Sequence, residues 1–362
     1  MSLFPHNPQY YIIMGEHYFK ECKQTGGSMS MTTTMNAALI KTYGGISGIE
    51  YGTSSIPEIK SNEVLIKVHA ASINPADLLF LNGHYGIKRT LPSVGGMEGC
   101  GTVIATGSSL VARMLKGKRV AFVSEVFGSW SQYTKASAMT CMVLPDQVTD
   151  EQGAVFFVNP ASALAMVKIA KQLKSKAIVQ TAGASALGKI LVQLGKQVNL
   201  PIISVVRKHE QRELLEEIGA QHILNSNSDT FEMDLKRKSI ELGAAVCFDA
   251  VGGDLTGRIL SSLPDGSTLF QYGLLSGSTT TINADDLVFR RKRIAGFWAS
   301  DWVKTQSIFE LLALQGSMKK SIGTDIQTEI SQCFPLSETV TAIHQYAANM
   351  TLGKVLLLPM EG

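Results

Sequence analysis

The sequence predicts an α/β protein in which a β-rich part is followed by a doubly wound parallel sheet. From Ala37 to about Phe157, short alternating apolar runs are broken by glycine and proline, which is typical of a small β-barrel or a partly open sheet. From Ala161 onward, strand-length apolar runs alternate with helix-length segments, which predicts a parallel sheet covered by helices. The tail from about Ser307 is too short for a third domain, so we expect it to return to the β-rich part.

Each element follows from its own apolar pattern. In the β-rich part we expect strands at 63–69, 101–107 and 118–123. In the parallel sheet we expect strands at 177–182, 201–206, 222–225, 245–251, 267–273 and 293–298, with helices near 187–198, 209–218, 230–242 and 254–263. In the tail we expect an amphipathic helix, a second helix at 339–350 and a strand at 354–358.

Composition bounds the class of protein and its partners. The chain of 362 residues is 45% hydrophobic and 17% charged, which is typical of a soluble globular protein, and no apolar run reaches the roughly 20 residues that span a bilayer. The net charge of +3 is too mild, and the basic residues too scattered, to indicate a nucleic-acid partner. The five cysteines are widely separated and none forms a C-x-x-C pair, so a reducing compartment fits best.

The first 35 residues differ in amino-acid composition from the rest of the chain. They contain Gly-Gly-Ser-Met-Ser-Met-Thr-Thr-Thr, which is typical of a flexible linker. A mitochondrial transit peptide is usually rich in arginine and poor in acidic residues, whereas this segment has no arginine and contains Glu16 and Glu21. We therefore expect a flexible extension and a cytoplasmic location, with the mitochondrion as the alternative.

The segment Thr181–Lys189, TAGASALGK, lies between a predicted strand and a predicted helix. Gly183, Ser185 and Gly188 stand at the spacing of the G-x-G-x-x-G dinucleotide fingerprint, with serine in the middle position. Small residues there let the backbone turn tightly and let N–H groups at the helix start approach a pyrophosphate. On this segment alone, an ordinary turn between a strand and a helix is an equally good interpretation. If the segment binds a dinucleotide, we expect the contacts with the cofactor to come from Gly183, Ser185, Ala186, Leu187 and Gly188.

The next predicted strand ends at Arg207-Lys208-His209. At this point an NAD-binding protein usually carries an acidic residue for the ribose 2′-hydroxyl, but here no carboxylate occurs before Glu210. Cations at this position attract a 2′-phosphate, so we expect NADPH rather than NADH. The alternative is that these residues are simply solvated loop residues.

The order of barrel, dinucleotide-binding sheet and returning tail resembles the medium-chain dehydrogenase/reductase superfamily. Leu91–Gly107 resembles its P-x-x-x-G-x-E-x-x-G-x-V segment, and Glu151–Val167, with FFVNPASALAMV, resembles the start of its interdomain helix. The resemblance implies a GroES-like β-barrel catalytic domain at 36–157 and 305–362, a Rossmann NADPH-binding domain at 158–304, and an N-terminal extension at 1–35. It also implies a homodimer, paired through the sheet edge near 293–298 or the strand before it.

The same resemblance bears on metal binding. Zinc-dependent members of the superfamily carry a cysteine where this chain has Asn74 and a histidine where it has Met97. Neither replacement is a suitable zinc ligand, and the four-cysteine lobe of those members is absent. We therefore expect no metal.

Asn74–Gly86 resembles the N-P-x-D…G-x-Y-G segment of the zinc-free mitochondrial 2-enoyl thioester reductases. Their proposed proton donor, a tyrosine, corresponds to Tyr85. Val158-Asn159-Pro160, Tyr272-Gly273 and Gly296-Phe297-Trp298 match other segments of that family, and Lys354 falls at a lysine that contacts the cofactor. By resemblance, the further cofactor contacts are Asn159, Tyr272, Gly273, Leu274, Leu275, Phe297, Trp298, Ala299 and Lys354, and the substrate pocket contains Asn74 and Trp298.

Three functions remain open on the sequence. The first is an NADPH-dependent enoyl thioester reductase in which hydride reaches the β-carbon and Tyr85 protonates the α-carbon. The second is a quinone or enone reductase of the neighbouring zinc-free branch, and the third is a non-catalytic NADPH-binding subunit of a larger assembly. Without the resemblance, Tyr85 could also be a half-buried loop residue between Gly83 and Gly86.

Two structural expectations concern neighbouring residues. We expect the backbone of Asn159 to be extended because it precedes Pro160, and we expect Asp77 to cap or brace the loop.

Overall fold

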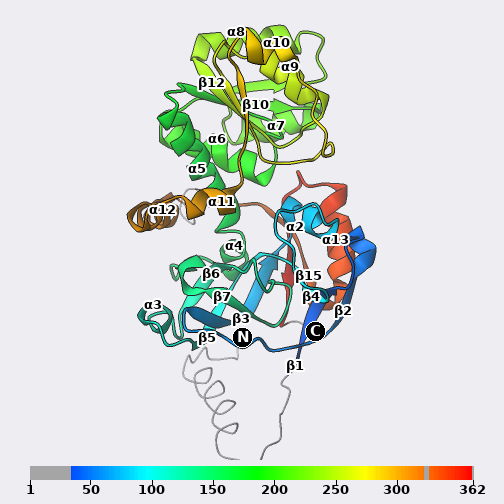
Figure 1. Ribbon diagram of the computed structural model, residues 1–362, viewed down its shortest axis with the longest axis vertical. Helices are drawn as coiled ribbons and strands as arrows, with labels where there is room; N and C mark the ends of the chain where they lie inside the picture. The colour runs from blue at the N-terminus through cyan, green and yellow to red at the C-terminus, as the bar shows by residue number, and fades with distance from the viewer. Residues whose placement is uncertain (1–33, 322–325, 361–362) are drawn as a thin grey trace, which may run out of the picture.

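The computed structural model describes residues 34–321 and 326–360 in two lobes that follow one another along the long axis of the molecule (Figure 1). The flexible extension expected at the N-terminus lies outside the described residues as far as residue 33. Its expected last residues do not belong to it, because Thr34 and Met35 pair with Ser55 and Ser54 in the first strand. Among the described residues, no helix is both long and apolar enough to cross a membrane.

The lower lobe in Figure 1 contains two β-sheets. The three-stranded sheet has the order β2-β1-β4, and the seven-stranded sheet has the order β15-β16-β3-β5-β6-β8, with β7 paired to β3. Its strands are β1 (Thr34–Ile40), β2 (Ile49–Ser55), β3 (Glu63–Ser72), β4 (Ser93–Val94), β5 (Glu98–Thr106), β6 (Arg119–Val123), β7 (Tyr133–Ser137), β8 (Cys141–Val143), β15 (Ile330–Pro335) and β16 (Lys354–Leu358).

The C-terminal tail returns to this lobe, as the sequence predicts. Leu356 and Leu357 of β16 pair with Ser72 and Ala71 of β3, so the end of the chain lies beside its β-rich part. The edge strand β15 is missing from the predicted elements, because its central residues are exposed and give no alternating apolar signal. The short helices of the lobe are η1 (Gly45–Gly48), α2 (Pro75–Leu81), α3 (Leu110–Arg113), η2 (Ala138–Thr140), α4 (Asp150–Gly153), η3 (Leu336–Glu338) and α13 (Thr339–Ala348).

The upper lobe is built on a six-stranded parallel sheet with the order β11-β10-β9-β12-β13-β14. The chain runs outward from β9 to one edge, then returns to the centre at β12 and runs to the other edge. Ligands of such sheets bind beyond the carboxyl ends of the strands where the order reverses, here β9 and β12. The strands are β9 (Ala177–Gln180), β10 (Ile202–Val206), β11 (His222–Asn225), β12 (Ala244–Asp249), β13 (Thr268–Gln271) and β14 (Arg293–Gly296).

The four helices predicted between the strands of the parallel sheet are present in the upper lobe, whereas the short helices at 284–288 and 299–304 are not among the predicted elements. The helices of the upper lobe and of the junction are α5 (Val158–Gln172), α6 (Ala186–Gln197), α7 (His209–Glu217), α8 (Phe231–Leu242), α9 (Asp254–Ser262), α10 (Ala284–Val288), α11 (Ala299–Lys304) and α12 (Ile308–Ser321). The extended conformation expected for Asn159 is wrong, because this residue lies in the first turn of α5. Pro160 is accommodated there because the first N–H groups of a helix have no partner within it.

One hydrophobic core joins the two lobes. Cys100 and Leu356 of the lower lobe belong to the same buried cluster as Ile178 and Phe248 of the upper sheet, with α5 between them. We accordingly propose 36–157 with 305–362, and 158–304, as the two domains, which share this packed interface.

Candidate active site

Tyr85 and Trp298 meet where the two lobes face each other. Tyr85 follows α2 in the lower lobe, and Trp298 lies between β14 and α11. The indole Nε1 of Trp298 donates a hydrogen bond to Oη of Tyr85 at 3.0 Å, and the ring centroids are 5.7 Å apart in an edge-to-face arrangement. A Cβ on Gly86 would lie 3.1 Å from the Trp298 ring, so the glycine after Tyr85 permits this close approach. The phenol oxygen is therefore the acceptor of this bond and keeps its own hydrogen to donate.

Several neighbours act on the ionisation of Tyr85. Burial, the largest influence, raises the pKa of the phenol, hydrogen bonding by Trp298 and Ser300 lowers it, and the net shift is upward. At neutral pH the side chain is thus the neutral acid, and the indole N–H is already placed to stabilise the phenolate that remains after proton loss.

Arg89 fixes the loop that carries Tyr85. Its guanidinium is buried and donates to four backbone carbonyls, those of Glu125 at 2.8 Å, Val94 at 2.6 Å, and Gly96 and Ser124 at 3.1 Å each. Five N–H donors on a planar group suit such a convergence of carbonyls. Burial lowers the pKa of Arg89 to about 10, which leaves it charged at neutral pH. The sequence analysis missed this residue, since a lone arginine in a loop gives no signal of burial.

Next to the loop lies a buried polar cluster made of Ser72, Asn74, Asp77, Glu98 and Lys354. The Asn74 amide donates to Ser72 Oγ at 2.9 Å and to Glu98 Oε2 at 3.2 Å, and its carbonyl oxygen accepts from Lys354. Burial lowers the pKa of Lys354. Both Asn74 donors and the Lys354 ammonium are thus engaged inside the protein, so the substrate role of Asn74 and the cofactor role of Lys354 stay predictions.

Glu98 joins this cluster to the interdomain helix. Its Oε1 accepts from the backbone N–H groups of Phe157 at 2.9 Å and Val158 at 2.7 Å, the start of α5. A carboxylate at a helix N-terminus accepts hydrogen bonds from the unpaired N–H groups and interacts favourably with the positive end of the helix dipole. Asn159, a predicted cofactor contact, is the next residue and is buried. The sequence motif marks Glu98, but the partners that give it this role are remote in sequence.

Asp77 braces α2, as the sequence analysis expects. Its Oδ2 accepts from the backbone N–H of Asn74 at 2.7 Å, which closes a capping box. Its other oxygen has no hydrogen-bond partner among the described residues. Burial raises the pKa of this carboxyl to about 7, because ionisation in an apolar environment is costly.

The predicted dinucleotide turn lies at the end of β9, where the strand order reverses. A Cβ on Gly183 would lie 2.8 Å from Cβ of Ser204, and a Cβ on Gly188 would lie 2.2 Å from the Gly183 carbonyl oxygen, so both positions require glycine. Ser185 is the N-cap of α6, and its Oγ accepts from the Gly188 N–H at 3.1 Å. Ala186 and Leu187 form the first turn, whose N–H groups have no partner within the helix.

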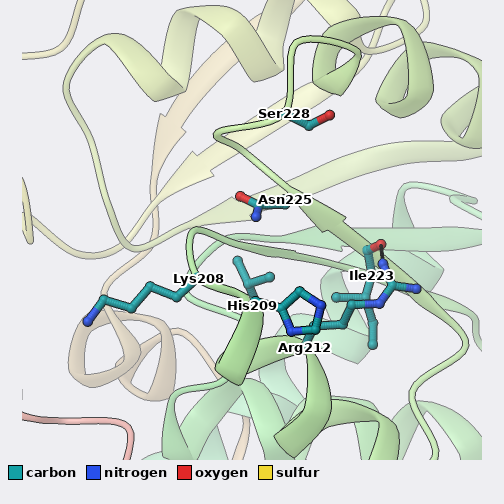
Figure 2. A pocket seen from close by; sticks show the side chains of 7 residues that line it. Lys208, His209, Arg212, Ile223, Asn225 and Ser228 are labelled. Atoms are coloured by element: carbon teal, nitrogen blue, oxygen red, sulfur yellow. Dashed lines mark hydrogen bonds between the residues drawn. The ribbon is translucent and has the colours of Figure 1, made fainter.

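A cavity of about 430 Å³ lies between α7 and the end of β11 (Figure 2). We call it the basic pocket because three of its side chains, Lys208, His209 and Arg212, are basic. Arg212 lies one helical turn after Lys208, and its guanidinium is held by Glu216 at 2.8 Å and by the Ile223 carbonyl at 3.4 Å. Arg207 is exposed but is not among the lining residues, which are Val206, Lys208, His209, Arg212, Ile223, Asn225 and Ser228.

Three polar residues that line the basic pocket, Arg212, Asn225 and Ser228, were not predicted from the sequence. Helical spacing from Lys208 could have pointed to Arg212, whereas Asn225 and Ser228 come from a neighbouring strand end and had no local signal.

The remaining predicted cofactor residues lie at the carboxyl ends of β13 and β14. A Cβ on Gly273 would lie 2.5 Å from the Ala250 carbonyl oxygen, so this turn also requires glycine. The ring of Phe297 packs edge-to-face on Phe248 in the core, which leaves little of its side chain for a ligand. Tyr272, Leu274, Leu275 and Ala299 lie at the same edge, and Leu275 is exposed.

The residues at the superfamily's zinc positions do not fit a metal. The Asn74 amide is engaged in the polar cluster, and Met97 is buried in the apolar core of the lower lobe. In the parts of the chain that the structure describes, no three His, Cys, Asp or Glu side chains gather in a way that could hold a metal ion.

Comparison with known proteins agrees with this architecture. Residues 60–146 match the family described as alcohol dehydrogenase GroES-like domain, and residues 186–315 match the family described as zinc-binding dehydrogenase. The mitochondrial enoyl-[acyl-carrier-protein] reductase of Caenorhabditis elegans is 31% identical over 68% of this chain and 71% of that protein. The mouse protein of the same name is 29% identical over 69% of this chain and 68% of its own length.

Solved structures extend the likeness to nearly the whole chain. A putative NADPH:quinone reductase from Mesorhizobium loti is 35% identical, covers 91% of this chain and 100% of its own, and superposes with a TM-score of 0.82. A mycobacterial protein solved in complex with NADPH is 26% identical, with 90% and 100% coverage and a TM-score of 0.78.

The chain belongs to the medium-chain dehydrogenase/reductase superfamily, among its zinc-free members. The predicted resemblance and the predicted fold class are thereby confirmed. Three of the relatives named above are reductases by name, and the mycobacterial protein was solved with NADPH bound.

Proposed function

We propose that this protein is an NADPH-dependent reductase of activated C=C bonds, and that its substrate is a 2-enoyl thioester. The single observation that carries the proposal is the hydrogen bond from Trp298 to Tyr85, which joins the two lobes and uses the phenol oxygen as acceptor, so that this bond does not engage the phenol hydrogen. The enoyl reductase names of the curated relatives support the choice of substrate.

The residues present fit NADPH. Gly183 and Gly188 let the turn pack tightly against Ser204 and against itself, and the N–H groups of the first turn of α6 that follows suit a pyrophosphate. The basic pocket lies at the end of the next strand, where the ribose of a dinucleotide is recognised, and its cations suit a 2′-phosphate. Bound NADPH supplies the hydride of the reaction.

Tyr85 supplies the proton in this proposal. As negative charge develops on the enolate of the thioester, the phenol O–H donates its proton to the α-carbon. The Trp298 N–H stays on the phenol oxygen and stabilises the phenolate, which then recovers a proton from solvent. The burial that raises the pKa of Tyr85 keeps the phenol protonated until the substrate needs the proton.

The test is NADPH oxidation measured side by side with crotonyl-CoA, a longer enoyl-CoA and a quinone. We expect the highest kcat/KM with a thioester. Turnover of the quinone alone would contradict the thioester assignment, and tight NADPH binding without turnover of any substrate would favour the non-catalytic alternative.

Quinone or enone reduction is the second candidate. It is favoured by the 35% identity to the putative NADPH:quinone reductase from Mesorhizobium loti, which extends over 91% of this chain. A quinone accepts hydride and forms oxyanions that solvent can protonate, so this reaction does not need a proton donor at carbon. The dependence on Tyr85 therefore separates the two candidates.

We also propose a homodimer paired through β14. This strand is one edge of the upper sheet, and Val288 and Phe289 of the neighbouring segment are largely exposed. Unpaired backbone groups at a sheet edge favour a two-fold partner. Light scattering at micromolar concentration is expected to give the dimer mass, and a monomer mass would contradict it. The cytoplasm stays our proposed location, with the mitochondrion as the alternative.

A further inference from the structure

Ala182 has an unusual backbone conformation for its residue type. It lies in the dinucleotide turn, directly before Gly183, and its φ of 49° is in the left-handed region, which is unfavourable for a residue with a Cβ atom. The other non-glycine residues with positive φ in the described part of the chain are exposed and lie outside helices and strands: Lys174, Asn199 and Arg291. Alanine has no side-chain group that could hydrogen-bond and hold this conformation, so its surroundings must impose it.

The residues on either side of the alanine are fixed to adjacent strands. The Thr181 hydroxyl donates to Asp249 Oδ1 at 2.6 Å and accepts from the backbone N–H of Ala250 at 2.8 Å, at the end of β12. The Gly183 N–H donates to the carbonyl oxygen of Val205 in β10 at 3.1 Å. The turn is thus held between two strands, and the hydroxyl of Thr181 makes both of its hydrogen bonds to β12 and the loop after it.

Asp249 is a fully buried carboxylate at the carboxyl end of β12. Its further donors are the Thr256 hydroxyl and the backbone N–H groups of Val251 at 2.8 Å and Gly252 at 3.3 Å. The carboxylate therefore fixes the loop after β12 as well as the turn after β9. The order of the sheet reverses at these two strands, and such sheets bind their ligands there.

We propose that Thr181 and Asp249 are positioning residues for dinucleotide binding: their hydrogen bond holds Ala182 in the conformation in which the start of α6 can receive the pyrophosphate. This inference rests on the NADPH binding of the proposed function. Without the bond, Ala182 relaxes out of the left-handed region, and a dinucleotide binds only to the fraction of molecules that returns to it. Because NADPH and NADH share the pyrophosphate, both should be affected alike.

Thr181→Val removes the hydroxyl and keeps the shape of the side chain. We expect calorimetry to show that the affinities for NADPH and NADH both fall about tenfold, the range of one hydrogen bond to a charged group. Thr181→Ser keeps the hydroxyl and should stay within about threefold of the wild type. Unchanged affinities in Thr181→Val would overturn the inference, and so would a loss for NADPH alone, which would place the effect at the 2′-phosphate.

Ala182→Gly separates backbone strain from a general loss of packing. Glycine adopts positive φ without a steric penalty, so in the Thr181→Val background it should restore affinity by about fivefold. In the wild-type background, where the hydrogen bond already holds the turn, the same substitution should change affinity by less than about twofold. Equal effects in the two backgrounds would overturn the inference, because the two residues would then act independently.

Ser175→Ala is the matched control at the opposite end of the same two strands. Ser175 is buried, and its hydroxyl donates to the Ala177 carbonyl in β9 at 2.6 Å and accepts from the Ala245 N–H in β12 at 2.9 Å. Urea unfolding should show a loss of stability in both Ser175→Ala and Thr181→Val, but dinucleotide affinity should stay within about twofold in Ser175→Ala. Equal losses of affinity would mean that the binding change only reports stability, and they would overturn the inference.

Thr181→Cys takes the place of Thr181→Val if the valine variant does not fold. Its thiol is a weak donor and acceptor, so we expect about a threefold loss of both affinities and recovery with Ala182→Gly. A loss that Ala182→Gly does not reverse would overturn the inference.

Binding measured without turnover distinguishes this inference from the proposed function. If the wild type binds NADPH but reduces no substrate, the proposed function fails, while weaker binding of both dinucleotides by Thr181→Val still supports the inference. If the wild type reduces thioesters and Thr181→Val binds both dinucleotides as tightly, the inference fails and the proposed function stands. A wild type that binds neither dinucleotide overturns the inference.

Discussion

The two sides of the proposed site are built in different ways. On the upper lobe, the dinucleotide turn and the basic pocket come from two strand ends and the helices that follow them, and the basic side chains lie at the surface. On the lower lobe, the loop after α2 that carries Tyr85 lies among buried ionisable side chains, Arg89, Asp77 and Lys354, and Arg89 and Lys354 bond to segments distant in sequence. In the proposed site, recognition of the cofactor's 2′-phosphate would therefore depend on exposed residues from neighbouring segments and would tolerate single substitutions. Proton delivery would depend on buried residues brought together from distant parts of the chain.

If proton delivery is more sensitive to substitution than cofactor binding, Tyr85→Phe should have the largest effect on turnover. The substitution removes only the hydroxyl, so we expect kcat on enoyl thioesters to fall by about two decades or more while NADPH affinity holds. Tyr51→Phe, at an exposed tyrosine in β2, is the matched control and should be silent. Steady-state kinetics that place the two variants within about threefold of each other would contradict the comparison.

Asp77→Asn tests the buried charges through the pH dependence of stability. Because burial raises the pKa of Asp77 to about 7, above the value near 4 of an unfolded aspartate, the folded protein keeps a proton that the unfolded chain loses. Stability is therefore lost as pH rises toward 7, by about 2 kcal/mol between pH 5 and pH 7. The asparagine carbonyl can still cap α2 but does not titrate. Urea unfolding should show this loss in the wild type and not in the variant; parallel pH profiles would indicate an ordinary carboxylate.

Trp298→Phe should have a smaller effect than Tyr85→Phe, because it removes a donor to the proton donor and leaves the acid in place. We expect thioester turnover to fall about tenfold, the range of one hydrogen bond to a charged group. Without the indole N–H, the pKa of Tyr85 should rise further, so the alkaline limb of the pH–rate profile should move to higher pH. An unchanged alkaline limb would mean that the limb does not report Tyr85.

Substitutions in the exposed basic pocket should have the smallest effect, and they should change only the preference for NADPH over NADH. Arg212→Ala is expected to weaken NADPH binding about tenfold and leave NADH binding nearly unchanged, because only NADPH carries a 2′-phosphate for the guanidinium. Arg207→Ala is the comparison variant and should have the smaller effect, since Arg207 does not line the basic pocket. Calorimetry with both cofactors decides; equal losses for NADPH and NADH would remove the phosphate-binding role.

Much of the fold could be predicted because its signals are local. The strands of the parallel sheet are continuous apolar runs. The glycines at 183 and 188 stand where the structure leaves no room for a Cβ atom. The strand β15 and the helical conformation of Asn159 could not be predicted in the same way. The first is an exposed edge strand with no alternation, and the second follows from the position of Pro160 in a first helical turn.

The candidate site could be predicted only in its parts. Resemblance to a family pointed to Tyr85 and to Trp298 separately, but their hydrogen bond joins residues 213 positions apart. The contact of Glu98 with the start of α5 spans 59 positions to Phe157 and depends on how the lobes pack. Burial of Asp77 and Arg89 likewise comes from tertiary packing, which no local pattern reports.

The central claim is that Tyr85 protonates carbon in a thioester substrate. The measurement that tests it most directly is the ratio of thioester to quinone reduction by the wild type and by Tyr85→Phe, with the same NADPH concentration. The proposal predicts that this ratio falls by about two decades in the variant, because only the thioester needs a proton at carbon. An unchanged ratio would contradict it, since the proton would then come from water or from another group.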